Sequence, residues 1–447
     1  MDVTVVGTGY VGLVAGTCLA NGGHRVMCVD IDEAKIERLR AGILPIYEPG
    51  LDALVLKNQA AGRLSFTTDL AAAVNAAPIV VIGVGTPGEE TGRPDLRALW
   101  SVVDGVCRHA RESKIVVVKS TVPVGTNALV QARLDEADIE HYAASNPEFL
   151  REGCAVGDFL HPDRVVIGVR NQYSEALLSE MYAPFVSESR PLVVTTPESA
   201  EMCKYAANAF LATKISFINE VANLCERLGA DVDEVRRARG LDHRIGFQFL
   251  RPGAGYGGSC FPKDVAAMIA IGEMHGYSPT MLEAVRDVNR AQKRTVFEKL
   301  EQEFSDLAGK RIAIWGLAFK PGTDDLREAP ALTLIDDLLA AGAEVQVHDP
   351  VAMENAQRQY PRDVVFCESP LATVEGADAL AIMTEWEDYQ TPDFGALARQ
   401  MSGRLIVDGR NLYDREKLRQ LGFDYLSVGR PAVYAATTVQ AVSSAVA

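Results

Sequence analysis

This chain of 447 residues has few basic side chains for its size. Its 44 Lys and Arg are outnumbered by 60 Asp and Glu, so the formal net charge is −16 at pH 7. Nucleic acids and anionic membranes are bound through a basic surface, because their phosphates need neutralising charge. We therefore expect neither as the main partner, although a local basic cluster can still bind a small phosphorylated ligand.

The chain also lacks paired cysteines. It has no C-x-x-C motif and no Cys/His cluster at zinc-like spacing, so no metal site is expected. We interpret the cysteines as reduced thiols of a cytoplasmic protein. The eight are scattered along the chain: Cys18, Cys28, Cys107, Cys154, Cys203, Cys225, Cys260 and Cys367.

Long apolar runs are missing too. No uninterrupted run approaches the ~18 residues of a membrane-spanning helix. The first residues run directly into a strand, with no basic segment and no cleavage site before it, so nothing predicts export. With 447 residues and 48% hydrophobic content, the chain is long enough for two or three globular domains.

What the chain does have is a glycine fingerprint between a strand and a helix. The β-rich run 3–6 ends in Gly7-Thr8-Gly9-Tyr10-Val11-Gly12, and an Ala/Leu-rich helix follows to about Asn21. A second strand, 25–29, ends at Asp30, close to the ~20-residue spacing expected for an acid that binds the adenosine ribose. The acid would repel a 2′-phosphate, so the pattern predicts NAD rather than NADP.

Two later strands, 79–83 and 114–119, also run into loops with ligand-binding character. The loops read Gly85-Thr86-Pro87 and Ser120-Thr121-Val122-Pro123. Doubly wound α/β folds bind their ligands at the carboxyl ends of parallel strands. We expect both loops to face the cofactor.

A long helix is predicted from Glu198 to about Leu228, without proline or glycine. Lys204 and Asn208 are four residues apart and share one face of it. Such a pair is usually part of an exposed polar stripe. The neighbouring residues are largely apolar on every side, which favours a polar spot inside a packed interface instead.

Cys260 lies in the run Gly255-Tyr-Gly-Gly-Ser-Cys-Phe-Pro-Lys263-Asp264. A thiol beside a nicotinamide can hold an aldehyde covalently while a second hydride leaves. The glycines allow close backbone approach, and Lys263 and Asp264 add a cation and a candidate base. On the local sequence alone, a buried structural cysteine remains an equal alternative.

A second α/β half is predicted from about Gly309, with strands at 311–316, 343–347, 378–383 and 404–407 and a helix at 329–341. Its first loop lacks the three glycines and carries Lys320, which suits a phosphate. The two halves should therefore bind different ligands.

Together these segments resemble the UDP-glucose 6-dehydrogenase family, within the nucleotide-sugar dehydrogenases that include GDP-mannose and UDP-N-acetylmannosamine enzymes. The resemblance extends to about residue 430. Besides the fingerprint and the two loops, the motifs that carry it lie at 146–153, 201–208, 251–264, 316–320 and 408–411.

The resemblance implies an α/β fold with two Rossmann-like doubly wound domains, joined by a long central helix and a helical dimerisation region. We expect an NAD-binding domain at 1–195, a central helical domain carrying the cysteine at 196–300, and a UDP-binding domain at 301–447. It also implies a homodimer.

The implied reaction is the four-electron oxidation of UDP-glucose to UDP-glucuronate with two NAD and water, and without a metal. Cys260 is then the nucleophile that forms a thiohemiacetal and a thioester, and Lys204 and Asn208 stabilise the oxyanion. Asp264, Thr121 and Glu148 are implied near the proton transfers, and which acid is the base at each step stays open.

The resemblance also implies two sets of binding residues. Those for the cofactor are Gly7, Gly9, Tyr10, Val11, Gly12, Asp30, Lys35, Thr86, Thr121, Glu152, Lys263 and Arg327. Those for the nucleotide sugar are Glu148, Phe149, Leu150, Glu152, Lys204, Asn208, Arg244, Phe249, Leu250, Gly253, Gly257, Cys260, Lys320 and Arg410. Arg244 is implied to reach the sugar of the neighbouring subunit.

Two alternatives remain. A related enzyme could oxidise GDP-mannose or a UDP-N-acetyl sugar by the same chemistry, although the aromatic residues around Cys260 resemble the UDP-glucose branch. A non-catalytic NAD- or nucleotide-sugar-binding protein would belong to a different class. The joint presence of Cys260, Lys204, Asn208 and Asp264 argues against it.

Overall fold

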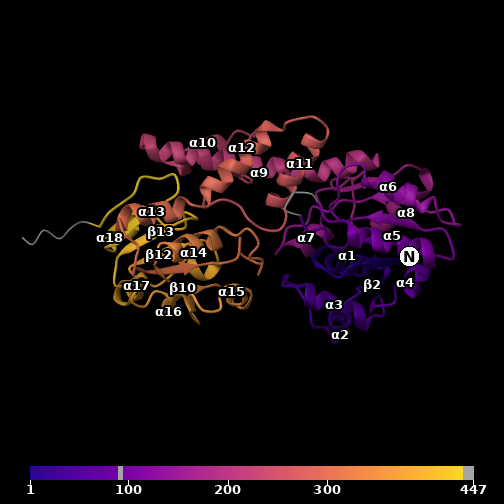
Figure 1. The fold of residues 1–447 in the computed structure, drawn as a ribbon, viewed down its shortest axis with the longest axis horizontal. Helices are drawn as coiled ribbons and strands as arrows, with labels where there is room; N and C mark the ends of the chain where they lie inside the picture. Colours follow the sequence, from indigo (N-terminus) through magenta and orange to yellow (C-terminus); the bar gives the residue numbers. More distant parts are fainter. Residues whose placement is uncertain (89–93, 436–447) are drawn as a thin grey trace, which may run out of the picture. The chain divides into compact units, whose positions relative to one another are not determined.

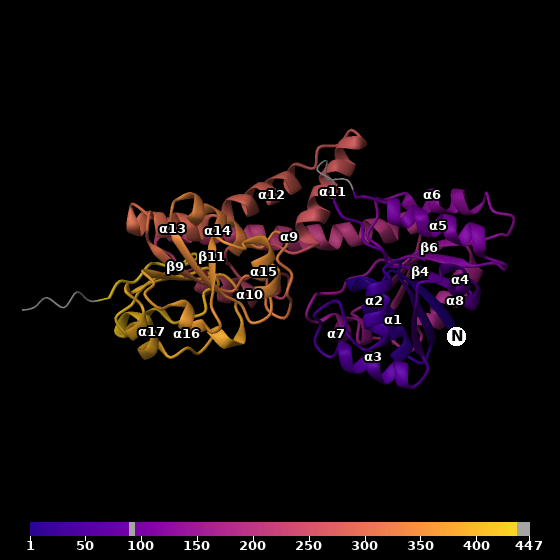
Figure 2. The ribbon, with the colours of Figure 1, turned by 60° about the horizontal axis from the view of Figure 1, so that its bottom comes forward.

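The computed structural model describes residues 1–88 and 94–435. They form two compact units, shown as ribbons in Figures 1 and 2. The first unit comprises residues 1–209 and 263–279, and the second comprises 210–262 and the chain from 280 onward. Each unit is built around one sheet, which confirms the expected α/β fold with two doubly wound halves.

The sheet of the first unit has eight strands in the order β3-β2-β1-β4-β5-β6-β7-β8. The first six are parallel in the order 3-2-1-4-5-6 of dinucleotide-binding folds, and β7 runs antiparallel to β6. Binding is expected where the order reverses, between β1 and β4. The strands are β1 (Asp2–Val6), β2 (Arg25–Val29), β3 (Leu64–Thr67), β4 (Ile79–Ile82), β5 (Ile115–Val118), β6 (Tyr142–Ser145), β7 (Val165–Gly168) and β8 (Leu192–Thr195).

Burial on both faces explains the composition of the central strands. Every residue of β4 and β5 is buried, so both are continuous Val/Ile runs rather than alternating ones. Helices cover the sheet, and several begin at an Asp or Asn whose side chain accepts a backbone N–H. They are α1 (Tyr10–Asn21), α2 (Glu33–Arg40), α3 (Leu51–Ala60), α4 (Leu70–Ala76), α5 (Arg97–His109), α6 (Thr126–Leu134), α7 (Ala155–Leu160) and α8 (Gln172–Tyr182).

Helix α9 (Pro197–Leu228) has 32 residues and passes from the first unit into the second. The expectation of one uninterrupted helix is confirmed, with its start one residue earlier than predicted. Gly229 follows it with φ of +72°, a left-handed conformation that ends helices readily. Four helices come next along the chain: α10 (Val232–Gly240), α11 (Phe261–Met274), α12 (Thr280–Gln292) and α13 (Thr295–Phe304).

The sheet of the second unit has six strands in the order β11-β10-β9-β12-β13-β14, which repeats the order of the six parallel strands of the first sheet, and all its strands are parallel. Figure 2 shows α13 and α14 on one side of it and α16 and α17 on the other. The strands are β9 (Arg311–Trp315), β10 (Glu344–His348), β11 (Val364–Phe366), β12 (Ala379–Ile382), β13 (Leu405–Asp408) and β14 (Asp424–Ser427). The helices are α14 (Pro330–Ala340), α15 (Met353–Gln359), α16 (Pro370–Thr373), α17 (Phe394–Gln400) and α18 (Arg415–Gln420).

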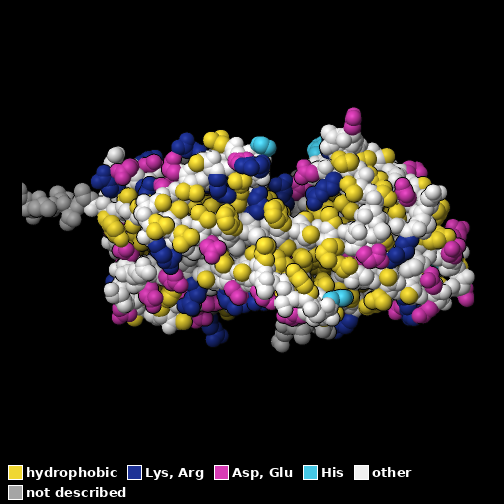
Figure 3. All heavy atoms as spheres, turned by 90° about the horizontal axis from the view of Figure 1, so that it is seen from above, with side chains coloured by type: hydrophobic (Ala, Val, Ile, Leu, Met, Phe, Trp, Pro, Cys, Tyr) yellow, Lys and Arg dark blue, Asp and Glu magenta, His cyan; other side chains and the backbone are white. Residues whose placement is uncertain are grey.

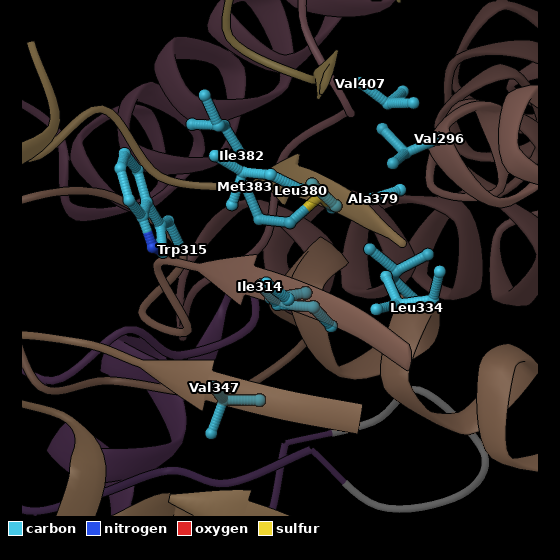
Figure 4. Close-up of a cluster of buried hydrophobic side chains, with 14 of the residues drawn as sticks. Val296, Ile314, Trp315, Leu334, Val347, Ala379, Leu380, Ile382, Met383 and Val407 are labelled. Atoms are coloured by element: carbon cyan, nitrogen blue, oxygen red, sulfur yellow. The ribbon is translucent and has the colours of Figure 1, made fainter. Parts of the chain in front are cut away.

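A continuous apolar core lies between this sheet and its helices. Figure 4 shows Ile314 and Trp315 of β9 with Ile382 of β12 and Leu334 of α14. The Trp315 ring stacks on Tyr389 with 5.0 Å between ring centroids, and its indole N–H donates to the carbonyl of Pro370. The aromatic pair thus packs the carboxyl end of β9 without leaving a buried polar atom unpaired.

The two halves differ at the acid that follows the second strand. Asp349, after β10, is buried, and it accepts the N–H groups of Leu317 and Ala318 as well as the indole N–H of Trp386. Its carboxylate therefore holds the protein's own loop. This supports the expectation that the two halves bind different ligands.

The predicted strands and helices are present, with ends that differ by one or two residues. Strands β3, β8, β11 and β14, which form the edges of the two sheets, were not predicted, and neither was β7, although all its residues are buried. Within the described residues, no helix is both long enough and apolar enough to cross a membrane.

Candidate active site

The glycine fingerprint forms a cradle before α1. Gly7 has φ of +101°, and a Cβ on Gly12 would lie 2.0 Å from the carbonyl oxygen of Gly7, so neither position tolerates a side chain. Gly9 differs, because a Cβ built there meets no atom within 4 Å. Helix α1 begins next to it without a side-chain cap. Open space beside an uncapped helix N-terminus suits a pyrophosphate.

Asp30 lies at the end of β2, beside this cradle. Its carboxylate accepts the N–H and the hydroxyl of Thr8 at 2.9 and 2.7 Å and the ammonium of Lys35 at 3.0 Å. Burial works against ionisation, but these donors outweigh it and lower the pKa of Asp30. An ionised acid at this point suits the ribose hydroxyls of NAD, and Lys35 lies beside it.

The loops after β4 and β5 are tied together. The hydroxyl of Thr86 donates to the carbonyl of Thr121 at 2.8 Å, and that of Ser120 donates to the carbonyl of Val84 at 2.6 Å. The two loops are therefore joined to each other at the carboxyl edge of the sheet.

Lys204 on α9 forms a buried ion pair with Glu148, which follows β6. Its Nζ lies 2.6 Å from Oε1, and Lys204 is only 3% exposed. Burial alone raises the pKa of Glu148, but Lys204, the Leu150 N–H and Lys119 together hold it below its usual value. Glu148 is therefore a carboxylate at neutral pH.

Asn208, one turn further along α9, contacts Asp264 on α11. Its Nδ2 donates to Oδ2 of Asp264 at 2.6 Å, and Lys263 donates to the other oxygen at 2.9 Å. Asp264 is fully buried and Asn208 is 7% exposed. The face that carries Lys204 and Asn208 is thus a buried polar spot, and the interpretation as an exposed stripe is wrong.

Phe149 and Leu150 continue the chain beyond Glu148, both partly buried. The guanidinium of Arg164 lies 3.7 Å from the centre of the Phe149 ring, and Nζ of Lys204 lies 5.9 Å from it. Glu152 is half-buried, and its charge contributes to raising the pKa of Tyr10. Residues 148–152 therefore link the fingerprint to α9.

Glu48 was missed by the sequence analysis. It is buried, accepts the hydroxyl of Tyr10, and takes the N–H groups of Gly153 and Ala155, each at 2.7 Å. It therefore holds the segment after β6 against the fingerprint. Its only sequence signal is an acid in the turn-like run Tyr47-Glu48-Pro49-Gly50.

Cys260 lies in the second unit, immediately before the first residue of α11. It is half-buried, and its sulfur lies 3.4 Å from the hydroxyl of Ser259. A helix N-terminus favours negative charge on such a sulfur. Two glycines before it cannot carry side chains, because a Cβ on Gly257 would lie 2.3 Å from the Glu328 carbonyl and one on Gly258 would meet the Phe319 ring.

Gly253 and Arg410 meet in the second unit. A Cβ on Gly253 would lie 2.9 Å from the carbonyl of Gly409 and 3.2 Å from the Arg410 guanidinium. Arg410 donates to the carbonyls of Met383, Gly255 and Phe319 and is largely buried. The loop before Cys260 is thus held against the turn after β13, which brings two predicted substrate residues together.

Phe249 and Leu250 lie in the same segment. Phe249 has φ of +59° and packs edge-on against Phe261. The Leu250 side chain is buried among Ile218 and Ala222 of α9, so it belongs to the core and only its backbone can face a ligand.

Three more predicted basic residues belong to the second unit. Arg244 is 78% exposed and pairs with Asp242 at 2.5 Å, while Arg327 pairs with Asp325 at 2.8 Å. Lys320 lies over the ring of Phe319 at 5.4 Å. Among the residues described, no three His, Cys, Asp or Glu side chains gather in a way that could hold a metal ion.

Comparison with known families accounts for nearly the whole chain. Residues 1–186 match the NAD binding domain of the UDP-glucose/GDP-mannose dehydrogenase family, 198–291 its central domain and 313–415 its UDP binding domain.

Individual relatives match over similar lengths. A UDP-glucose 6-dehydrogenase of Pseudomonas aeruginosa is 47% identical over 96% of this chain and 98% of its own. One of Bacillus subtilis is 45% identical over 96% of this chain and 94% of its own. The solved structure of a UDP-glucose dehydrogenase from Pyrobaculum islandicum superposes with a TM-score of 0.90 at 41% identity, over 96% of this chain and 98% of that one.

Proposed function

The chain belongs to the UDP-glucose/GDP-mannose dehydrogenase family, and from that premise we propose that it is a UDP-glucose 6-dehydrogenase. The observation that carries the proposal is the buried polar group of Lys204, Glu148, Asn208 and Asp264 in an NAD-binding unit, with Cys260 four residues before Asp264. A dehydrogenase that stops at an aldehyde needs no thiol there. The product is UDP-glucuronate.

NAD is the cofactor, since the first 186 residues are the family's NAD binding domain. When bound, each NAD would accept one hydride, so two NAD in turn would take the two hydrides lost when a primary alcohol becomes a carboxylate. The cradle at Gly9 receives the pyrophosphate, and Asp30 with Lys35 holds the ribose. Thr86 and Thr121 line the approach to the nicotinamide.

Cys260 provides the covalent step. Its thiolate attacks the C6 aldehyde to form a thiohemiacetal, and loss of a hydride from C6 leaves a thioester. Water then adds to the thioester and releases the carboxylate and the thiolate. The Lys204 ammonium and the Asn208 amide supply the positive and neutral donors that an oxyanion on C6 requires.

Two carboxylates serve the proton transfers. Glu148 is ionised at neutral pH because cations surround it, so it can accept a proton from an attacking water. Asp264 is held by Asn208 and Lys263 and can retain a water at the sugar.

The nucleotide part of the substrate belongs to the second unit. Arg410, Lys320 and the glycine-rich loop 253–258 offer a guanidinium, an ammonium and close backbone approach, which suit a diphosphate. Phe149, Leu150 and Glu152 are further candidates for contacts with the sugar in this proposal. The partition into domains at 1–195, 196–300 and 301–447 follows the same division of roles.

We further propose a homodimer formed along α9. Four large apolar side chains between its middle and its C-terminal end are exposed: Phe210 (64%), Phe217 (52%), Leu224 (52%) and Leu228 (79%). Figure 3 views the face on which α9 lies in Figure 1 and shows hydrophobic side chains gathered there. Spacings of seven and four residues put them on one helical stripe, as in helix pairs. The exposed Arg244 is then available to the partner's sugar site.

The reaction is proposed to take place in the cytoplasm. The structure describes all eight cysteines and joins no two of them in a disulfide, which suits a reducing compartment.

The test is the yield of NADH per sugar. Purified protein with excess NAD should form about two NADH per UDP-glucose and UDP-glucuronate as product. If the protein oxidises only GDP-mannose or only a UDP-N-acetyl sugar, the assigned substrate is wrong and the proposed reaction type stands. No NADH from any of them would favour a non-catalytic binding protein.

A further inference from the structure

Lys119 is a buried cation that the proposed mechanism does not use. It follows β5 directly and is only 5% exposed. Its Nζ donates to Oδ1 of Asn146 at 3.0 Å and lies 5.7 Å and 6.0 Å from the ring centres of Phe159 and Tyr182. An ammonium in such surroundings is costly to bury, so its presence requires a reason.

The Asn146 side chain is a junction between four elements. Its Oδ1 accepts both Lys119 and the hydroxyl of Tyr182 on α8, and its Nδ2 donates to the carbonyl of Val166 on β7 at 2.8 Å. Its backbone N–H donates to Val118 on β5. The start of Asn146-Pro147-Glu148 is therefore fixed from every side, two residues before the carboxylate that pairs with Lys204.

Lys119 also acts on Glu148 through its charge. Three groups favour the ionised form of Glu148: Lys204 on α9, the Leu150 N–H of its own loop, and Lys119 after β5. Burial lowers the pKa of Lys119 to about 8, and this value includes the opposing effect of Glu148 and a smaller lowering effect of Lys204. Lys119 is thus still largely protonated at neutral pH, and Glu148 is influenced by two cations.

We propose that Lys119 is a positioning residue of the active site, which holds the segment of Glu148 in place through Asn146 and adds positive charge near its carboxylate. The inference rests on the proposed function insofar as Glu148 takes part in the oxidation. Without Lys119, the pKa of Glu148 would be higher, so its carboxylate would become protonated at a higher pH. The segment that begins at Asn146 would also lose the hydrogen bond from Lys119. Lys119 acts through these two residues and need not touch the substrate.

The same strand offers a matched control. Lys114 precedes β5 at its other end, is 3% exposed, and donates to the carbonyl of Ala77 at 3.0 Å. It is equally buried and equally long, but the charge that acts on it is that of Glu112. Substitution of Lys114 therefore shows the effect of losing a buried lysine in general, and substitution of Lys119 shows the additional effect on Glu148.

The first measurement is kcat against pH, with saturating UDP-glucose and NAD, for Lys119→Met, Lys119→Arg and Lys114→Met. Lys119→Met should lower kcat at pH 7 about tenfold or more and move the acid limb of the profile up by about one pH unit. The KM for NAD should stay within about twofold. Lys119→Arg should recover most of the loss, and Lys114→Met should leave the profile unmoved.

An unmoved acid limb in Lys119→Met would overturn the inference, as would an equal shift in Lys114→Met. If Lys119→Met does not fold, Asn146→Ser takes its place, since it cuts the link and keeps both cations. It should lower kcat with little shift of the acid limb, and an unchanged kcat would count against the positioning role.

A second measurement needs no activity. Urea unfolding of Lys119→Met, Glu148→Gln and the double variant forms a double-mutant cycle. The shift in midpoint caused by Lys119→Met should be clearly smaller in the Glu148→Gln background. Additive shifts would refute the coupling. If the wild-type protein oxidises none of the sugars, the proposed function fails while this cycle still decides the inference.

Discussion

At the scale of single residues, Cys260 gives the sharpest test of the proposed chemistry. Cys260→Ala removes the only sulfur that the mechanism uses, so the aldehyde cannot be held and no acid should form. We expect UDP-glucuronate production to fall by at least about 10³-fold, with NAD affinity unchanged because the fingerprint lies elsewhere in the chain. Mass spectrometry of the product and NAD titration measure the two effects. Undiminished UDP-glucuronate would remove the covalent mechanism.

Asp30 tests the cofactor assignment. Its carboxylate is ionised beside Thr8 and Lys35, so it accepts ribose hydroxyls and repels a 2′-phosphate. Asp30→Ala should raise the KM for NAD roughly tenfold. It should also lower the ratio of kcat/KM for NAD to kcat/KM for NADP. Asp32→Ala is the control, since Asp32 caps α2 two residues further on. Equal effects of the two substitutions would mean that Asp30 acts only by stabilising the loop.

Cys260 and Asp30 could be predicted from the sequence because each belongs to a short motif with a known chemical role. The sequence could assign no role to Lys119 or Glu201, whose partners are far away in sequence, such as Asn146 for the lysine and Gly125 for the acid. A buried charge can be recognised only when the elements around it are known. For Lys119 the one available signal was a lysine directly after four apolar strand residues.

At the scale of elements, Glu201 joins α9 to the start of α6. It accepts the N–H groups of Gly125 and Asn127 at 2.6 and 2.8 Å, and thereby caps the helix that follows the Thr121 loop. Burial raises its pKa to about 7 despite these two donors. A carboxyl whose folded pKa lies above the unfolded value stabilises the fold most below the unfolded pKa, and that contribution is lost as the pH rises through the folded pKa.

Glu201→Gln should therefore remove part of the pH dependence of unfolding. Between pH 4.5 and about 7, the wild-type protein should lose on the order of 1–3 kcal/mol relative to Glu201→Gln, which keeps an acceptor but cannot ionise. Chemical unfolding at several pH values measures the difference. Glu220→Gln, at an exposed position of the same helix, is the control. Parallel stability curves for wild type and Glu201→Gln would refute the assignment.

Some helices and strands could be predicted from the sequence and others could not. Helix α9 and the central strands β1, β2, β4 and β5 follow from long or fully apolar patterns. Strand β8 has two half-exposed valines at a sheet edge, and β11 has only three residues, so neither pattern stands out from a loop. Strand β7 runs antiparallel to β6, and the two strands pair only through Ser145 and Gly168. No local sequence pattern predicts this orientation.

At the scale of the whole molecule, two sheets with the same strand order perform different tasks. In the first unit the acid after the second strand, Asp30, is partly exposed and lies beside Gly9, which has free space around it. Its counterpart in the second unit, Asp349, is buried and accepts hydrogen bonds from its own loop. Shared topology therefore does not imply shared binding. This difference between the halves is what allows one chain to provide separate sites for a dinucleotide and a nucleotide sugar.

The proposed dimer is a property of the whole molecule and can be tested through α9. Phe217→Glu places a charge in the middle of the stripe formed with Phe210, Leu224 and Leu228, and burying that charge against a second copy would be unfavourable. We expect the dissociation constant of the dimer to rise at least roughly tenfold. Sedimentation or light scattering would show a shift toward the 48.3 kDa monomer.

Leu129→Glu provides the matched control, because Leu129 is a comparably exposed apolar residue (60%) on α6. It should leave the mass in solution unchanged, and equal melting temperatures of the two variants would show that Phe217→Glu acts on association rather than on folding. If Arg244 completes the partner's sugar site, dissociation should also raise the KM for UDP-glucose more than the KM for NAD. A Phe217→Glu variant that keeps the mass of the wild-type protein would exclude this stripe as the dimer interface.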